Sequence, residues 1–352
     1  MNHGFFSFPF SQGNEIIDIK EFDTSSAYYI PPNAKRLFLF AVGGGGGGAG
    51  GWRSATNGAG GGSGGMAGNI VLTEISTKMF AGVQTLNIII GSGGTGGAGS
   101  VCNGASPSNG GSGGATQIWI PGRKSYFISA AGSQYGAAPT STTLPGSQAQ
   151  SGLSVGMSLL FGVPIHFSIH PYSSQSVGAP SFPSPYNAFG YNNKGGQGAW
   201  NSDGNPVVVN SPYGCGGAGG GAVNSSTGVA TAGGAIRILS PTSDFQNVTG
   251  VSREVVSFMT DTKYAQGDTV YSGGAINTAT SPLDATELIC SECMFSAGFG
   301  GAGGGAGAST SANNGAKGYR GGGGAGGGGS KAVTAGNGGA GGNGYVKIIT
   351  IG

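Results

Sequence analysis

Short apolar segments recur along the chain, and each has the length and composition of a β-strand. They are rich in Ile, Val, Phe and Tyr, and several alternate in character, as Leu86, Ile88 and Ile90 do against Asn87 and Ile89. The predicted strands are residues 36–42, 69–75, 85–91, 116–120, 125–130, 235–240, 254–259 and 345–351. No segment has the periodicity of an amphipathic helix, so we expect no substantial α-helix.

The stretches between these strands are dominated by glycine, which supplies 79 of the 352 residues, about three times its usual share. The tracts are residues 43–51, 58–65, 91–99, 110–114, 214–222, 298–307, 321–329 and 336–344. Charged residues make up only 8% of the chain, hydrophobic residues reach 37%, and the formal net charge is +2. Disordered chains combine low hydrophobicity with high net charge, so this composition favours an ordered protein.

Regular alternation of strands and glycine tracts limits the conformations that the tracts can adopt. Collagen is excluded because the glycines keep no strict Gly-X-Y period, and a phosphate-binding P-loop is excluded because no tract ends in G-K-[ST]. A packed bundle of polyglycine II helices remains, in which backbones approach closely enough for hydrogen bonds between helices. Interior positions should then be glycine, and other residues should mark outward or end positions. A flexible linker is the alternative.

The predicted fold class is therefore all-β with packed polyglycine II helices, in which short strands join a glycine-rich helical sandwich. Three regions are expected along the chain. Residues 1–20 would be an N-terminal docking peptide, and residues 21–240 a β and glycine-rich domain with a loop insertion at about 133–213. Residues 241–352 would hold a second loop insertion (241–296) and a glycine-rich segment that closes the bundle.

Charge and cysteine content exclude several classes of partner. No Lys/Arg cluster is present, so nucleic acid is not expected as a partner. The N-terminus lacks the features of a signal peptide, and no apolar run is long enough to insert into a membrane. The four cysteines are scattered, and the C-x-x-C pair "CSEC" (290–293) has no second pair to complete a metal site. We expect neither a metal nor another cofactor.

No arrangement of residues predicts an enzyme. "HFSIH" spaces His166 and His170 as in a helical metal site, but Pro164 and Pro171 flank it and no adjacent Glu provides a general base. The acidic residues of 241–296 are the place where a polysaccharide hydrolase would have its paired carboxylates, although solvated surface groups would look the same.

Aromatic residues interleaved with Ser, Asn, Gly and Pro are typical of recognition surfaces, and residues 133–213 have this composition. The receptor-binding candidates are Tyr135, Tyr172, Tyr186, Tyr191 and Trp200. Packing inside a small core of the insertion is the alternative for these side chains. A second apolar cluster at the N-terminus is the candidate for docking to another protein, or else a strand that caps the first tract; it consists of Phe5, Phe6, Phe8 and Phe10.

The order of these motifs resembles the glycine-rich domain of bacteriophage tail fibres and other virion proteins. The resemblance rests on "FDTSSAYYIPPNAKRLFLFAVGGGGGG", "LNIIIGSGGTGGAGS", "SYFISAAG" and the terminal "GGNGYVKIITIG". It covers residues 21–132 and the last 55 residues. In that family an aromatic and proline-containing opening precedes the first strand, and this chain matches it loosely at Phe22, Ser25, Tyr28, Tyr29 and Pro31. The chain also resembles the tip adhesins of T-even-type phages, whose polyglycine II helices present variable loops.

The resemblance implies a virion protein, assembled in the host cytoplasm, that binds without catalysis. It would act as a tail fibre or tail-tip adhesin and bind a host surface glycan or an outer-membrane protein. Its other partners would be tail or fibre proteins, and a homotrimer is conceivable. Two alternatives remain open at this point. One is a purely architectural component such as a fibre shaft, head fibre or tail part, and the other is a surface-polysaccharide depolymerase.

Overall fold

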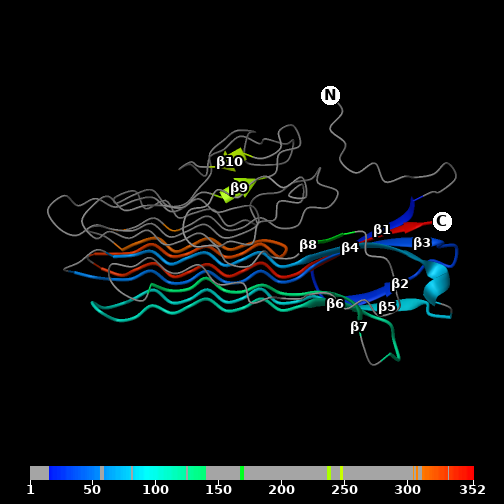
Figure 1. Ribbon diagram of the computed structural model, residues 1–352, viewed down its shortest axis with the longest axis horizontal. Helices are drawn as coiled ribbons and strands as arrows, with labels where there is room; N and C mark the ends of the chain where they lie inside the picture. Colours follow the sequence, from blue (N-terminus) through cyan, green and yellow to red (C-terminus); the bar gives the residue numbers. More distant parts are fainter. Residues whose placement is uncertain are drawn as a thin grey trace.

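A computed structural model describes residues 16–55, 59–80, 82–123, 126–139, 311–331 and 333–352, together with Gly304, Gly307 and the backbone of three short strands. A β-sandwich lies at one end of the molecule, and long extended segments run side by side from it toward the opposite end (Figure 1). We call these segments rods and the end opposite the sandwich the distal end.

Two antiparallel sheets form the sandwich. The larger has the order β1 (Ile16–Phe22), β11 (Tyr345–Ile351), β3 (Arg36–Val42), β4 (Ile70–Ser76) and β8 (Phe167–Ile169). The smaller has the order β2 (Ser26–Tyr29), β5 (Thr85–Ile89), β6 (Thr116–Trp119) and β7 (Tyr126–Ala130). Strands β9 (Ile236–Ile238) and β10 (Gln246–Val248) pair with each other. The 3₁₀ turn η1 (Thr77–Phe80) is the sole 3₁₀- or α-helical segment among the described residues.

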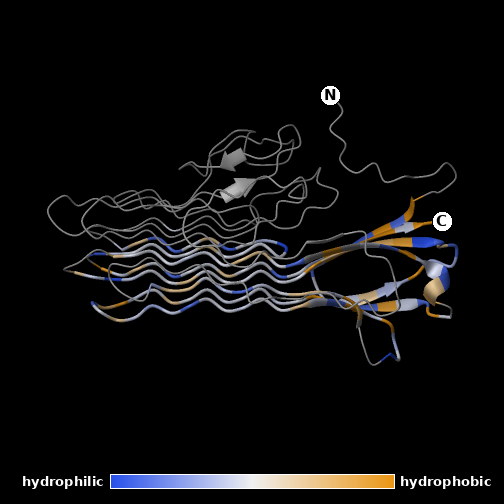
Figure 2. Cartoon of the chain, viewed as in Figure 1, coloured by the Kyte–Doolittle hydropathy of each residue, from blue (hydrophilic) through white to orange (hydrophobic). Residues whose placement is uncertain are grey.

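The core of the sandwich is built from alternate positions of the facing strands. Leu37 and Leu39 of β3 and Ile348 of β11 are fully buried, and they belong to the same cluster as Leu86 and Ile118 of the smaller sheet. Figure 2 shows strongly hydrophobic strands here, whereas the rods are close to neutral in hydropathy. Apolar burial therefore stabilises the sandwich, and the rods need another source of stability.

Most rods continue a strand directly, and the order of strands in each sheet becomes the order of rods. The rods are numbered along the chain as rod 1 (43–52), rod 2 (59–69), rod 3 (91–100), rod 4 (107–115), rod 5 (131–139), rod 6 (311–318), rod 7 (321–330) and rod 8 (334–344). Strands β11, β3 and β4 join rods 8, 1 and 2, and strands β5, β6 and β7 join rods 3, 4 and 5. Rods 6 and 7 continue no described strand.

Backbone hydrogen bonds between rods repeat every three residues. In rod 1 the N–H groups of Gly43, Gly44 and Gly45 donate to rods 2, 4 and 8 in turn, each over 2.9 Å, and the sequence of partners repeats through Gly51. The carbonyl groups of rod 1 accept from rods 3, 5 and 7 with the same period. Three residues per turn without internal hydrogen bonds is the geometry of polyglycine II. Among the described rod residues only Gly321 has a positive φ, so the helices are left-handed.

Rod 1 is the centre of a hexagonal arrangement. It donates to three antiparallel rods (2, 4 and 8) and accepts from three parallel rods (3, 5 and 7). Further N–H···O=C bonds join the neighbours to one another in the closed ring 3–4–5–2–7–8. Every described residue of rod 1 is buried, yet its backbone groups find partners in the surrounding rods.

Close approach of the backbones explains why rod 1 is made of glycine. A β-carbon added at Gly45 would lie 2.0 Å from the carbonyl oxygen of Gly322, and one added at Gly46 would lie 1.8 Å from that of Gln134. Real β-carbons do not approach oxygen atoms so closely, so a side chain at either position would force two rods apart. The hydrogen bonds between those rods would then be lost.

The expectation that other residues mark only outward or end positions is wrong for Ala49, Ser63 and Ala325, which are completely buried inside the bundle. Rod 5 diverges from rod 2 at the level of Ser63 and Ala49. The N–H···O distance from rod 2 to rod 5 grows from 3.0 Å at Asn69 to 3.4 Å at Ser63, and the Ser63 hydroxyl donates across the wider gap over 2.8 Å. The period of rod 1 places Ala49 opposite the same part of rod 5. A small side chain is therefore accommodated where a neighbouring rod moves away.

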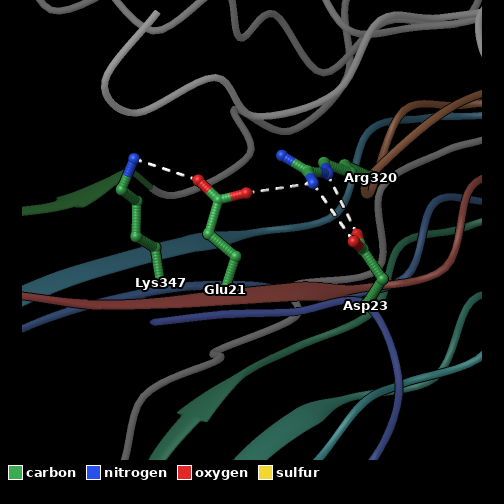
Figure 3. A network of polar contacts seen from close by, with 4 residues as sticks. All are labelled: Glu21, Asp23, Arg320 and Lys347. Carbon is green, nitrogen blue, oxygen red and sulfur yellow. Dashed lines mark hydrogen bonds and ion pairs between the residues drawn. The ribbon is translucent and has the colours of Figure 1, made fainter. Parts of the chain in front are cut away.

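A cluster of charged residues attaches rods 6 and 7 to the sandwich (Figure 3). Arg320 lies in the turn between these rods and donates to Asp23 through Nε over 2.9 Å and Nη2 over 3.1 Å. Its Nη2 also donates to Glu21 over 3.2 Å, and Lys347 pairs with Glu21 at 3.0 Å. The guanidinium lies 4.1 Å from the ring centroid of Tyr345, a cation–π contact. These contacts hold Arg320 at a φ of 40°, which a side chain rarely adopts.

The Arg320 cluster also sets the ionisation of Glu21. Burial raises the pKa of this carboxyl, but hydrogen bonds with Lys347 and Tyr345 and the charges of Lys347 and Arg320 outweigh burial, so the pKa lies below its ordinary value of 4.5. A carboxyl with a lowered pKa in the folded state stabilises the protein above its unfolded pKa and loses that contribution as the pH falls through the folded value.

Most predicted strands are confirmed, with ends that differ by one or two residues. Strand β9 confirms the segment predicted at 235–240, and the strand predicted at 254–259 lies outside the described residues. Strands β1, β2, β8 and β10 were not predicted. Residues 16–20 belong to β1 and residues 131–139 form rod 5, whereas tract 214–222 and most of tract 298–307 lie outside the described residues.

A bulky side chain inside rod 1 should abolish folding. We expect Gly46→Val to cost more than about 4 kcal/mol, because the added atoms collide with the backbone of rod 5. Ala98→Val is the matched control, because Ala98 is exposed on rod 3 and the change should stay within about 0.5 kcal/mol. Soluble yield and urea denaturation measure both variants. Equal stability of the two would mean that rod 1 is a flexible linker.

Removal of the Arg320 side chain should loosen rods 6 and 7. We expect Arg320→Ala to lower the free energy of unfolding by about 2 kcal/mol at pH 7, and Arg320→Lys to recover only part of the loss because lysine cannot form the forked contact. Lys20→Ala is the control, since the Lys20–Asp18 pair is exposed and 3.8 Å long. Because the pKa of Glu21 is lowered, the cost of Arg320→Ala should shrink as the pH falls below 4.5. A cost that stays constant with pH would exclude the ion pair with Glu21 as its source.

Candidate functional site

The described charged groups are divided between the two ends of the molecule. All the carboxylates among the described residues, namely Asp18, Glu21, Asp23 and Glu74, belong to or adjoin strands of the larger sheet. The described part of the distal end has no carboxylate and no histidine, so it offers no acid–base pair. Within the described ranges, no group of three His, Cys, Asp or Glu side chains could hold a metal ion.

The turns that connect the rods at the distal end form the candidate site. We define this distal surface as residues 53–55 after rod 1, residues 101–106 between rods 3 and 4, and Lys331 and Val333 between rods 7 and 8. Val101 is 70% exposed and Val333 is 45% exposed, although neither is needed to fill the core. Cys102, Asn103 and Ser106 are also exposed. Exposed apolar side chains beside polar ones are typical of binding surfaces.

Hydrogen bonds join the separate turns of the distal surface. Arg53 Nη1 donates to the carbonyl oxygen of Val101 over 2.7 Å, and the Ala55 N–H donates to Asn103 Oδ1 over 2.9 Å. The Ala105 N–H closes the second turn on the carbonyl of Cys102 over 3.2 Å, with Gly104 at a φ of +78°. The turns of rods 1 and 3 are thereby held in a fixed relation, which lowers the entropic cost of binding a partner.

Trp52 is the buried residue that directly precedes the distal surface. It ends rod 1, is only 7% exposed, and its backbone N–H donates to Gly60 over 2.8 Å. Its carbonyl accepts from Ser330 in rod 7 over 3.0 Å, so the residue is fixed at both backbone groups. Its indole N–H is buried without a hydrogen-bond partner. The buried indole and the two backbone hydrogen bonds fix the end of rod 1, from which residues 53–55 of the distal surface continue.

The distal surface suits binding by contact and charge. Arg53 and Lys331 are its described charges, and both are positive. Val101 and Val333 supply apolar area, and Asn103 and Ser106 supply hydrogen-bonding groups. Such a surface can bind a polar or anionic partner without changing it chemically.

The residues predicted for receptor binding are only partly placed by the structure. Tyr135 lies in the middle of rod 5, half-buried and separate from the distal turns. Tyr172, Tyr186, Tyr191 and Trp200 lie outside the described residues, as do the docking candidates Phe5, Phe6, Phe8 and Phe10. Residues 167–169, between His166 and His170, form the extended strand β8. The two histidines themselves lie outside the described residues.

Sequence reasoning missed the turn at residues 101–106, although a signal for it was present. Asn103-Gly104 is a strong turn dipeptide, and it lies between two glycine tracts together with the apolar Val101. The surrounding excess of glycine hides this signal, because Asn-Gly and Ser-Gly pairs are common throughout the chain.

Comparison with known proteins adds one finding. Residues 21–350 match a protein family described as a glycine-rich domain. The comparison with curated proteins gives no significant match. Among the described residues, no helix is long and apolar enough to span a membrane.

The exposed part of the distal surface should tolerate substitution. We expect Val101→Glu and Val333→Glu together to change the free energy of unfolding by less than about 1 kcal/mol, because both side chains face water. Trp52→Ala at the same end should cost about 3 to 5 kcal/mol, because it removes a buried side chain. Thermal and urea denaturation compare the variants. A large cost for the valine changes would show that these side chains stabilise the fold.

Proposed function

Since the chain belongs to the glycine-rich domain family, we propose that it is a bacteriophage virion protein, a tail fibre or tail-tip adhesin, and binds a host cell-surface receptor. It binds through loops held at the distal end of a polyglycine scaffold. The receptor is a surface glycan or an outer-membrane protein, and other tail or fibre proteins are its partners in the particle.

One observation carries this proposal. The described rods are closely packed by backbone hydrogen bonds, and they end in turns that expose the side chains of Val101 and Val333, which the core does not use. A protein that must vary its binding surface benefits from this division, because a change in a turn leaves the rods intact.

Adsorption to host cells tests the proposal. Purified full chain is added to host cells before the phage, and we expect it to reduce phage adsorption in a dose-dependent way. The double variant Val101→Glu, Val333→Glu should reduce adsorption at least about tenfold less effectively, whereas Ala98→Val on the side of rod 3 should act like the parent protein. Thermal denaturation of each preparation confirms that it is folded. If the folded parent chain does not compete, the adhesin role is wrong.

An architectural role predicts a different position in the particle. A cryo-EM map of the virion would place the distal surface against other virion proteins if the chain is a shaft, head fibre or internal tail part. Exposure of the same surface at the end of a tail or fibre is the arrangement that the adhesin requires.

A further inference from the structure

Asparagine side chains complete the backbone hydrogen bonding at the outer edge of the bundle. In rod 3, every third N–H, at Gly94, Gly97 and Ser100, donates inward to rod 1. The N–H groups one residue before two of these, at Gly93 and Gly99, point away from rod 1. No rod lies in that direction among the described residues, so both N–H groups lie at an edge of the described bundle.

Two side chains of rod 8 take the place of the missing rod. Asn343 Oδ1 accepts from the Gly93 N–H over 2.9 Å, and Asn337 Oδ1 accepts from the Gly99 N–H over 2.8 Å. Both asparagines are exposed, and they are six residues apart on a helix that turns every three. They therefore point in one direction, with Ala340 between them. We call Asn337, Ala340 and Asn343 the rod 8 column.

The same device occurs at other edges of the bundle. The N–H of Asn337 donates to Asn314 Oδ1 in rod 6 over 2.8 Å, and the N–H of Ala138 in rod 5 donates to Asn109 Oδ1 in rod 4 over 2.8 Å. In each case a side-chain amide oxygen replaces the backbone carbonyl that a further rod would supply. Repetition on separate rods indicates a common role.

That role follows from the way in which the rods pack. A polyglycine rod with outward N–H groups is an unpaired edge, comparable to the edge strand of a sheet, and another glycine-rich rod can pair with it. Each copy of this chain brings several such rods. We propose that the rod 8 column closes this edge, and that the groove between rods 3 and 8 is a latent binding surface for a glycine rod of a second copy. The inference does not depend on the role of the protein in a virion.

Two variants of the full chain separate closure from loss of hydrogen bonds. An all-glycine column (Asn337→Gly, Ala340→Gly, Asn343→Gly) removes both the amide oxygens and the β-carbons. An all-alanine column (Asn337→Ala, Asn343→Ala) removes the oxygens and keeps the β-carbons. A β-carbon between two packed rods would lie about 2 Å from a carbonyl oxygen, as at Gly96 and Gly338, so the alanine column should still exclude another rod.

Hydrogen exchange and sedimentation velocity provide the measurements. In both variants we expect exchange at Gly93 and Gly99 to become about five- to tenfold faster than in the parent chain, when measured at concentrations where each variant has the parent mass. At higher concentration, only the glycine column should increase in mass relative to the parent chain. Unchanged exchange in the alanine column would overturn the proposal, as would equal masses for the glycine column and the parent chain or equal association of both variants. If the glycine column does not fold, Asn343→Gly is compared with Asn343→Ala in the same way.

Discussion

The hydrogen bond between the backbones of neighbouring rods is the interaction on which the structure depends. It forms only where neither chain has a β-carbon in the contact, as the distance of 1.8 Å at Gly46 makes plain. Each such bond contributes little alone, and glycine loses more backbone entropy on folding than any other residue. Rod 1 compensates by making bonds on all six sides. Its stability is therefore a property of the whole ring, and a single rod could not exist without its neighbours.

The sandwich determines which rods become neighbours. Packed side chains hold its two sheets about 10 Å apart. Along the chain of β3 these large side chains end at Val42, and Gly43 begins rod 1. Strand pairing fixes the register before the rods begin, because Val42 opposite Ile70 leads directly to the Gly43–Asn69 hydrogen bond. Rods 6 and 7 have no strand to align them. The Arg320 cluster provides their attachment instead, through side chains from β1, β11 and the residues that follow β1.

The sequence predicts the elements of this fold better than their arrangement. Alternation of Leu86 and Ile88 with Asn87 identifies β5, and the absence of side chains in 43–48 identifies a packed rod, because both patterns are local. Strand β1 was missed because it alternates poorly, with Asp18 and Lys20 among its isoleucines. The ring order could not be predicted, because it arises from contacts between residues as distant as Gly45 and Gly342. The distal surface could not be predicted for the same reason, because the turn at Asn103 forms part of a site only when the other turns lie beside it.

The packing of the rods also explains which positions of this glycine-rich protein can vary. In rod 3 the positions whose N–H groups donate to rod 1, namely Gly94, Gly97 and Ser100, are buried, whereas Ser92 and Thr95 face water. Two constraints therefore act with a period of three: inward positions must be glycine or a small residue, and outward positions carry side chains that keep another rod away. Among the described residues beyond the sandwich, the turns at the distal end escape both constraints. Under the proposed binding role, natural variation should accordingly gather in those turns, because a new side chain there neither breaks a rod nor opens an edge.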